Sequence, residues 1–153
     1  MPLESRPLYI DELVADCVKE TRLLAPPGVS LHSRAPTDLE LMGDERLLRQ
    51  MLINLLKNAV LHTASGGLVR VDIVTGKDGV EIEVTDSGQG IPEAERERIF
   101  ERFVQLDPSR QGEGSGLGLP IARAIAHAHG GSLVLARSDR SGSTFLVRLP
   151  LRA

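Results

Sequence analysis

Two runs of alternating apolar and polar residues constrain the fold of this chain more than any other feature. Residues 68–75 and 80–86 each alternate with period two, and only Gly76-Lys77-Asp78-Gly79 separates them. Such alternation indicates strands with one buried face, and the short glycine-bounded connection predicts an antiparallel hairpin. The second run ends in Asp86-Ser87-Gly88-Gln89-Gly90, so the chain leaves its sheet at a carboxylate followed by two glycines.

This strand end has a functional and an ordinary interpretation. Gly88 and Gly90 permit positive φ angles and leave room for a flat ligand, and the carboxylate of Asp86 can accept a hydrogen bond from an amino group such as that of a purine. An ordinary strand-to-loop turn uses the same residue types. The segment does not decide between them without partners elsewhere in the chain.

The remaining periodicity predicts helices and strands in one domain. The spacing of apolar residues predicts a helix at 11–24, with Asp11 as its N-cap and Cys17 as core filler. It also predicts a second helix of about 18 residues, capped by Asp44. Further elements are expected as an edge strand at 7–10, a strand at 29–34, a short charged helix at 92–103, a helix at 119–129 and a hairpin of 133–137 with 144–149. Helices would cover one face of a mixed, mostly antiparallel sheet, which is an α+β two-layer sandwich.

Composition excludes several classes of function. Aromatic residues make up 3% of the 153 residues and the net charge is −3, which is not the composition of a nucleic-acid-binding protein. No apolar run approaches the roughly 20 residues that cross a bilayer, and the one cysteine is typical of a reducing compartment. We expect a cytoplasmic, monomeric domain that does not itself insert into a membrane. This expectation holds whether or not the domain is part of a larger, membrane-attached protein.

Asn54 and Asn58 lie four residues apart, on one side of the second helix. Asparagine is unfavourable inside helices, so the pair calls for an explanation. The two amides could hydrogen-bond neighbouring loops, or their oxygens could help to hold Mg²⁺ and nucleotide phosphates. The helix alone leaves both interpretations open.

The segment Gly112-Glu113-Gly114-Ser115-Gly116-Leu117-Gly118-Leu119 stands immediately before a helix. Glycines expose successive backbone N–H groups, and a helix start adds a partial positive charge. The segment therefore predicts a phosphate-binding loop. It lacks the Gly-Lys-Ser/Thr of a Walker loop, and no strand leads into it as in a dinucleotide-binding unit.

Together these motifs resemble those of one family. NLLKNAVLHT (54–63), DSGQGIP (86–92), IFERF (99–103) and GEGSGLGL (112–119) are similar, in order, to the N, G1, F and G2 boxes of two-component sensor histidine kinases, and 142–145 resembles their last short motif. The resemblance covers essentially the whole chain. It implies the Bergerat fold of GHKL proteins, with about three helices on a sheet, as one catalytic and ATP-binding domain over 1–153 with an ATP lid at about 92–116.

The resemblance also implies ligands and roles. Asn54 and Asn58 would be the catalytic residues and hold Mg²⁺, Asp86 would take the adenine amino group, and Thr144 would contact the adenine through water. The implied ATP-binding set is Asn54, Lys57, Asn58, His62, Asp86, Gly88, Gly90, Ile91, Phe103, Gly114, Ser115, Gly116, Leu117, Gly118, Leu119 and Thr144.

Three positions depart from the family pattern. Leu61 stands where many relatives carry a cation near the phosphates, and Lys57 is a candidate substitute. His62 replaces an aromatic residue, and Glu113 replaces the first glycine of the usual pair in the lid.

The implied reaction is transfer of the γ-phosphoryl group of Mg-ATP to a histidine. None of the four histidines is followed by an acidic residue, and no two-helix dimerisation stretch precedes them. We therefore expect the phosphoacceptor on a separate helical hairpin of a parent kinase that serves a response regulator, and no autophosphorylation by this chain alone.

Other functional classes share the fold. A GHKL-type ATPase would carry a water-activating glutamate where this chain has Asn54. An anti-sigma-factor-like serine kinase stands alone without a hairpin, and a third alternative is a non-enzymatic module that binds a nucleotide or a partner. IFERF and GSGLGL favour the histidine kinases.

Overall fold

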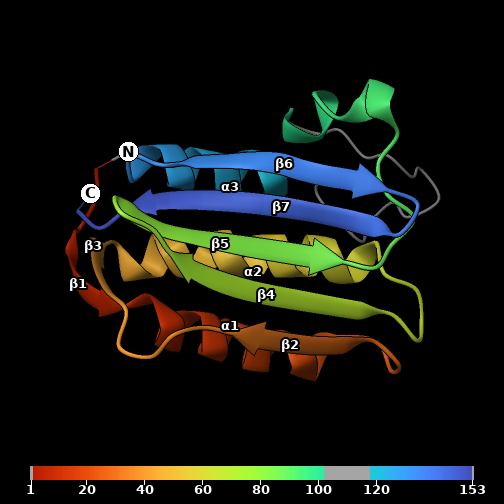
Figure 1. Cartoon of the computed structure of the whole chain (residues 1–153), viewed down its shortest axis with the longest axis horizontal. Coiled ribbons are helices and arrows are strands. Elements are labelled where there is room, and N and C mark those ends of the chain that lie inside the picture. The colour runs from red at the N-terminus through yellow and green to blue at the C-terminus, as the bar shows by residue number, and fades with distance from the viewer. Residues whose placement is uncertain (1, 102–117, 153) are drawn as a thin grey trace.

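A mixed five-stranded sheet forms one layer of the computed structural model, which describes residues 2–101 and 118–152. The strand order is β2-β4-β5-β7-β6 (Figure 1), and the only parallel pair among the described strands of this sheet is β2 with β4. The strands span Ser30–Arg34 (β2), Leu68–Thr75 (β4), Gly79–Asp86 (β5), Ser132–Asp139 (β6) and Gly142–Pro150 (β7). The predicted mixed, mostly antiparallel sheet is confirmed.

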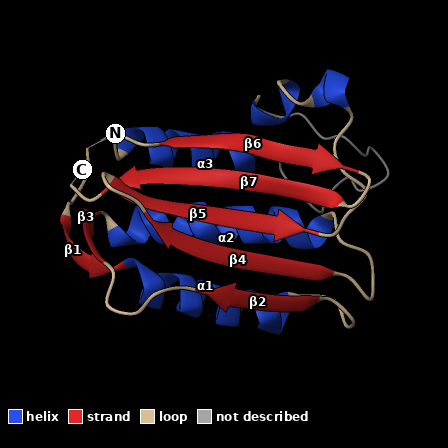
Figure 2. Ribbon diagram, in the orientation of Figure 1, coloured by secondary structure: helices blue, strands red, loops and turns tan. Residues whose placement is uncertain are grey.

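Three α-helices of the described chain cover one face of this sheet, as Figure 2 shows. They are α1 (Ile10–Leu24), α2 (Glu45–Leu61) and α3 (Gly118–Ala128). The apolar side chains of α2 recur every three or four residues and are buried, as are the alternate residues of β5 that face them. One core therefore lies between the two layers, and the predicted α+β two-layer sandwich is confirmed.

A second, two-stranded sheet pairs β1 (Arg6–Tyr9) with β3 (Glu40–Gly43). β1 is the strand predicted at 7–10, but it does not border the main sheet. The sequence did not predict β3, because four residues between a turn and a helix are too few to show alternation clearly.

The predicted N-cap of α2 is confirmed, because Asp44 Oδ1 accepts a hydrogen bond from the Leu47 N–H at 3.2 Å. The predicted N-cap of α1 is wrong. The helix begins at Ile10, and the carboxylate of Asp11 accepts hydrogen bonds from the backbone of Asp38 and Leu39 instead. The segment before β3 crosses the first turn of α1, and it takes the acceptor that would otherwise cap the helix.

The single charged helix predicted at 92–103 is also wrong in its described part. Two short 3₁₀ helices, η1 (Glu93–Glu95) and η2 (Arg98–Phe100), occupy the segment. Ile99 enters the core, and the Phe100 ring packs edge-on against Phe145 with centroids 6.2 Å apart. These contacts of Ile99 and Phe100 hold the backbone against the sandwich. The segment therefore does not form the continuous helix that its charged residues predicted. Most of the predicted lid at 92–116 lies outside the described residues.

Within residues 2–101 and 118–152, no helix has the length and apolar character needed to span a lipid bilayer.

Candidate functional site

The described candidate residues gather at one end of the sandwich. This end holds the C-terminal ends of α2 and β5, the turn between β6 and β7, and the start of α3 (Figure 1). Residues from 54 to 144 converge there because the β5–β7 pairing and the α2–α3 packing bring separate segments together. Both chain termini lie at the opposite end.

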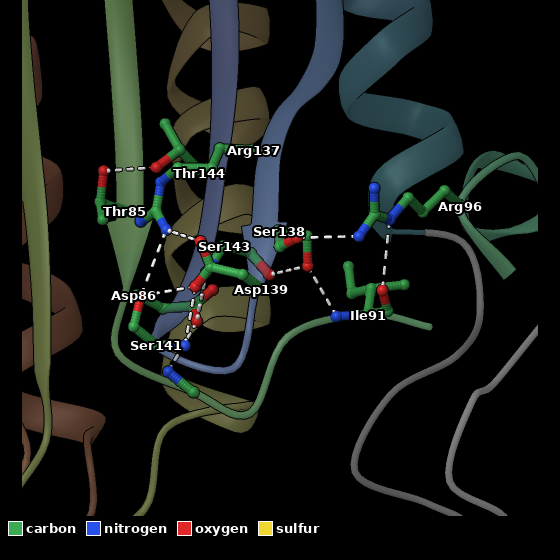
Figure 3. A network of polar contacts seen from close by, with 11 residues as sticks. Thr85, Asp86, Ile91, Arg96, Arg137, Ser138, Asp139, Ser141, Ser143 and Thr144 are labelled. Carbon is green, nitrogen blue, oxygen red and sulfur yellow. Dashed lines mark hydrogen bonds and ion pairs between the residues drawn. The ribbon is translucent and has the colours of Figure 1, made fainter. Parts of the chain in front are cut away.

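Asp86 is the most deeply buried charged side chain of this end, with 4% exposure. Its Oδ1 accepts hydrogen bonds from the N–H groups of Gly88 at 2.9 Å and Ser143 at 3.3 Å, and Figure 3 shows it at the centre of a polar network. Burial raises the pKa of the Asp86 carboxyl, although the two backbone donors and the nearby His62 act in the opposite direction. The structure therefore holds a buried acid whose ionised form is only partly compensated by the protein.

Gly88 and Gly90 are required by the protein's own backbone. A Cβ at Gly88 would collide with the carbonyl oxygen of His62, and a Cβ at Gly90, where φ is +85°, would collide with the carbonyl oxygen of Asp139. The room that the glycines leave is filled by the end of α2 and by the β6–β7 turn. The structure thus gives both glycines a role in close packing of the segment after β5, and their predicted role of leaving space for a flat ligand stays a prediction.

The strand register separates Thr144 from Asp86. Thr144 pairs with Thr85, and the Oγ1 atoms of these two residues are hydrogen-bonded at 3.1 Å. Ser143, in contrast, pairs with Asp86. Because successive side chains of a strand point to opposite faces, Thr144 lies on the face away from the Asp86 carboxyl. The contact predicted for Thr144 therefore does not fit this register, and Ser143 occupies the position beside Asp86.

The amides of α2 face the start of α3. Asn54 Nδ2 donates to the carbonyl oxygen of Gly118 at 3.2 Å, which ties the two helices together. Asn58 Nδ2 is buried and has no hydrogen-bond partner within the described part of the chain. A buried amide without a partner is costly, and an amide can turn either its nitrogen or its oxygen toward a ligand. Asn58 therefore fits a ligand-binding role, and its oxygen is of the kind that Mg²⁺ prefers.

Other candidates are placed less specifically. Lys57 is exposed on α2. His62 ends α2, with its N–H donating to the Asn58 carbonyl oxygen. Ile91 and Leu119 are buried in the core. Five predicted residues lie outside the described chain, namely Phe103, Gly114, Ser115, Gly116 and Leu117.

Besides Ser143, sequence reasoning missed Ser138 and Arg96 of the network. Ser138 Oγ accepts from the Ile91 N–H at 2.7 Å and is hydrogen-bonded to Ser143 Oγ at 2.8 Å. Arg96 donates to the carbonyl oxygens of Ser138 at 2.8 Å and Ile91 at 3.3 Å. No sequence signal marks either residue, because both act through contacts between segments some 40 residues apart.

Comparison with known proteins agrees with this geometry. Residues 43–153 match the family described as histidine kinase-, DNA gyrase B- and HSP90-like ATPase. The probable sensor histidine kinase TcrY of Mycobacterium tuberculosis is 37% identical over 152 residues, which are 98% of this chain and 32% of TcrY. This chain spans about a third of the length of the curated relatives it matches.

Solved structures show the same fold. The mycobacterial sensor histidine kinase MprB has a TM-score of 0.83 and 29% identity, with 96% of this chain and 97% of that chain covered. Full-length ShkA, in complex with AMPPNP, has a TM-score of 0.85 and 31% identity, with 98% of this chain and 32% of that chain covered.

The fold and the site define an ATP-binding domain of the kind found in histidine kinases. This chain belongs to the HATPase_c family, and the proteins it is similar to include the sensor histidine kinases TcrY and MprB. The family resemblance and the Bergerat-type fold predicted from the motifs are both confirmed.

Proposed function

We propose that this chain binds Mg-ATP at the end of the sandwich that holds Asp86 and Asn58, and transfers the γ-phosphoryl group to a histidine. The acceptor would be carried by a separate helical hairpin of a parent kinase, which in turn would serve a response regulator. The observation that supports this most is the buried carboxyl of Asp86, positioned by backbone N–H groups from two segments.

Asp86 would recognise the base. Its Oδ1 already accepts two backbone hydrogen bonds, so Oδ2 is the oxygen that we assign to the adenine amino group. Ser143, beside Asp86 in the register, takes the water-mediated contact that the motif comparison placed on Thr144. Gly88, Gly90 and Ile91 shape this wall through their packing.

Asn58 and Asn54 would hold the phosphate side of the nucleotide. The unpartnered amide of Asn58 would bind the magnesium ion, which neutralises phosphate charge when bound. Asn54, which is hydrogen-bonded to Gly118, would keep the start of α3 beside the phosphates. The backbone N–H groups at the start of a helix favour anions. Lys57, His62 and Leu119 remain proposed members of the site, as do the five residues outside the described chain.

The chemical step needs alignment more than covalent help from the protein. The bond between the γ-phosphorus and the β–γ bridging oxygen breaks, a phosphorus–nitrogen bond forms on the acceptor imidazole, and ADP leaves. A nitrogen with a free lone pair attacks, so the acceptor histidine must be neutral. This chain would supply the bound nucleotide, and the hairpin would supply the nucleophile.

The test is transfer of labelled phosphate from ATP to a purified dimeric hairpin domain mixed with this chain. We expect acid-labile, base-stable label on the hairpin, which is the behaviour of phosphohistidine, and no label on this chain alone. Label on a serine of a supplied protein, or phosphate release without any labelled protein, would refute the proposal in favour of a serine kinase or an ATPase. The Asp86→Asn variant should give no label.

A further inference from the structure

Three residues form one row across the sheet at the site. Asp86 of β5 pairs with Ser143 of β7, and Ser143 pairs with Ser138 of β6. Residues paired across strands project to the same face, so these three side chains lie together on the face that the helices cover. Figure 3 shows the row at the centre of the polar network.

A β-bulge creates this row. Leu135 pairs with Phe145, but the next pair is Arg137 with Thr144, so β6 has one extra residue, Ala136, at this point. If Ala136 instead paired with Thr144 in a regular ladder, Arg137 would stand opposite Ser143 and Ser138 would be shifted out of the row. Bulges commonly redirect a side chain next to a functional site, and here the bulge replaces a long cation with a small hydroxyl.

The Ser138 hydroxyl joins two walls of the site. It accepts from the Ile91 N–H at 2.7 Å, so its own hydrogen is free to be donated to Ser143 Oγ at 2.8 Å. The Ser143 N–H in turn donates to Asp86 Oδ1 at 3.3 Å. A single hydroxyl therefore links the segment after β5 with the residue that orients the Asp86 carboxyl.

Arg96 braces the same pair of residues through their backbones. Its guanidinium donates to the Ser138 and Ile91 carbonyl oxygens at 2.8 and 3.3 Å. Ser138 and Ile91 are thus held to each other by a hydroxyl and by a cation. Two independent connections of this kind resist relative movement of β6 and the segment that follows β5.

From this geometry we propose that Ser138 is a positioning residue for recognition of the adenine amino group, acting on Asp86 through Ser143. This inference rests on the proposed function, in which Asp86 receives that amino group. A carboxyl that must accept a hydrogen bond at one oxygen depends on how its other oxygen is held. Loss of the Ser138 hydroxyl would loosen Ser143 and with it the orientation of Asp86.

The test compares ATP with purine riboside triphosphate, which lacks only the 6-amino group. Affinities of the wild type, Ser138→Ala and Ser138→Thr are measured by calorimetry with Mg²⁺ present. We expect the wild type to prefer ATP by about 10-fold or more. Ser138→Ala should reduce this preference by about 3- to 10-fold while the analogue's affinity stays nearly constant, and Ser138→Thr, which keeps a hydroxyl, should restore it.

A control and a second background make the test specific. Ser141→Ala removes a hydroxyl of the same hairpin that is bonded to Asp139, and it should leave the preference unchanged. In a Ser143→Ala background, Ser138→Ala should have little further effect on the preference, because its connection to Asp86 is already lost. Thermal unfolding of every variant checks that it is folded. If Ser138→Ala does not fold, the proposal is decided by Ser143→Ala, which should lower the preference for ATP, and by Ser138→Thr, which should keep it.

Two outcomes would overturn the proposal. One is an equal loss of affinity for ATP and the analogue, which would make Ser138 a purely structural residue. The other is an unchanged preference in Ser138→Ala. A wild type that does not distinguish the two nucleotides would instead refute the role of Asp86 in the proposed function, so the two failures are separable.

Discussion

The binding role proposed for Asp86 carries a cost to stability. Its burial raises the pKa of the carboxyl, so the folded state disfavours the ionised form. The destabilisation is absent below the unfolded-state pKa of about 4, grows as pH rises, and is complete above the folded-state pKa. A buried carboxyl with a raised pKa is typical of a functional site.

We therefore expect Asp86→Asn to raise the melting temperature at pH 7.5 and to abolish detectable ATP binding. Asparagine keeps an acceptor for the Gly88 and Ser143 N–H groups but carries no charge to bury. The gain in melting temperature should shrink towards zero below about pH 4, where Asp86 of the wild type is neutral. Thermal unfolding of both proteins across pH checks this, and a gain that persists in acid would contradict the assigned cause.

Asn58 is expected to show the same separation of stability from binding. Its buried Nδ2 lacks a partner among the described residues, and alanine is the better helix former by several tenths of a kcal/mol. Asn58→Ala should leave the free energy of unfolding unchanged or higher and lower Mg-ATP affinity on the order of 10- to 100-fold.

The matched control for Asn58 is Gln50→Ala, which removes an exposed amide from the same helix. It should leave both quantities nearly unchanged. Urea unfolding and calorimetric titration of ATP, with and without Mg²⁺, provide the measurements. An equal loss of affinity with and without the metal would show that Asn58 does not act through magnesium.

At the scale of elements, the site depends on register as much as on residue type. β5, β7 and β6 bring Asp86, Ser143 and Ser138 into one row only because β6 contains a bulge at Ala136. Similarly, the segment after β5 can approach α2 and the β6–β7 turn because Gly88 and Gly90 carry no Cβ. The positions of the strands decide which side chains form the site.

An alanine inserted between Arg137 and Ser138 tests this register directly. The inserted residue should then stand opposite Ser143 in place of Ser138, so the hydrogen bond between the Ser138 and Ser143 hydroxyls is lost and ATP affinity should fall. Deletion of Ala136, the extra residue itself, is the control, because it leaves Arg137 opposite Thr144 and Ser138 opposite Ser143 and should retain ATP binding. Thermal unfolding and ATP titration measure the effects; an insertion variant that still binds ATP normally would contradict the role of the register.

At the scale of the whole molecule, one core joins all three helices to the sheet. Cys17 of α1 lies inside it, fully buried, and burial raises the pKa of its thiol to about 11. The predicted core-filling role of Cys17 is confirmed. A neutral, inaccessible thiol reacts only when the protein opens.

We expect Cys17 to resist a thiol-reactive dye at pH 8 in the native protein and to react fully in urea. The midpoint of labelling should coincide with the midpoint of unfolding followed by circular dichroism, because a small single-core domain unfolds cooperatively. Since the unperturbed thiol titrates near 8.5, the unfolded chain supplies the positive control. Labelling well before the loss of secondary structure would show that α1 detaches independently.

The order of motifs and the spacing of apolar residues were sufficient to predict the layers, the β4–β5 hairpin, the cap at Asp44 and the family. Each of these depends on interactions between residues close in sequence, or on a period that a short window reveals. The Asp11 cap and the helix at 92–103 were predicted wrongly for the complementary reason: in both places contacts with a distant segment replaced the local preference.

What the tertiary structure alone decided is how the site is assembled. Strand register decides that Asp86 is buried and that Ser143, rather than Thr144, lies beside it. The bulge in β6 brings Ser138 into the same row. Close packing of the segment after β5 requires Gly88 and Gly90. Because side chains alternate between faces, a shift of one residue moves every side chain to the other face of the sheet. Residue types in the sequence determine what chemistry is available, and the pairing between distant strands determines which of those groups meet.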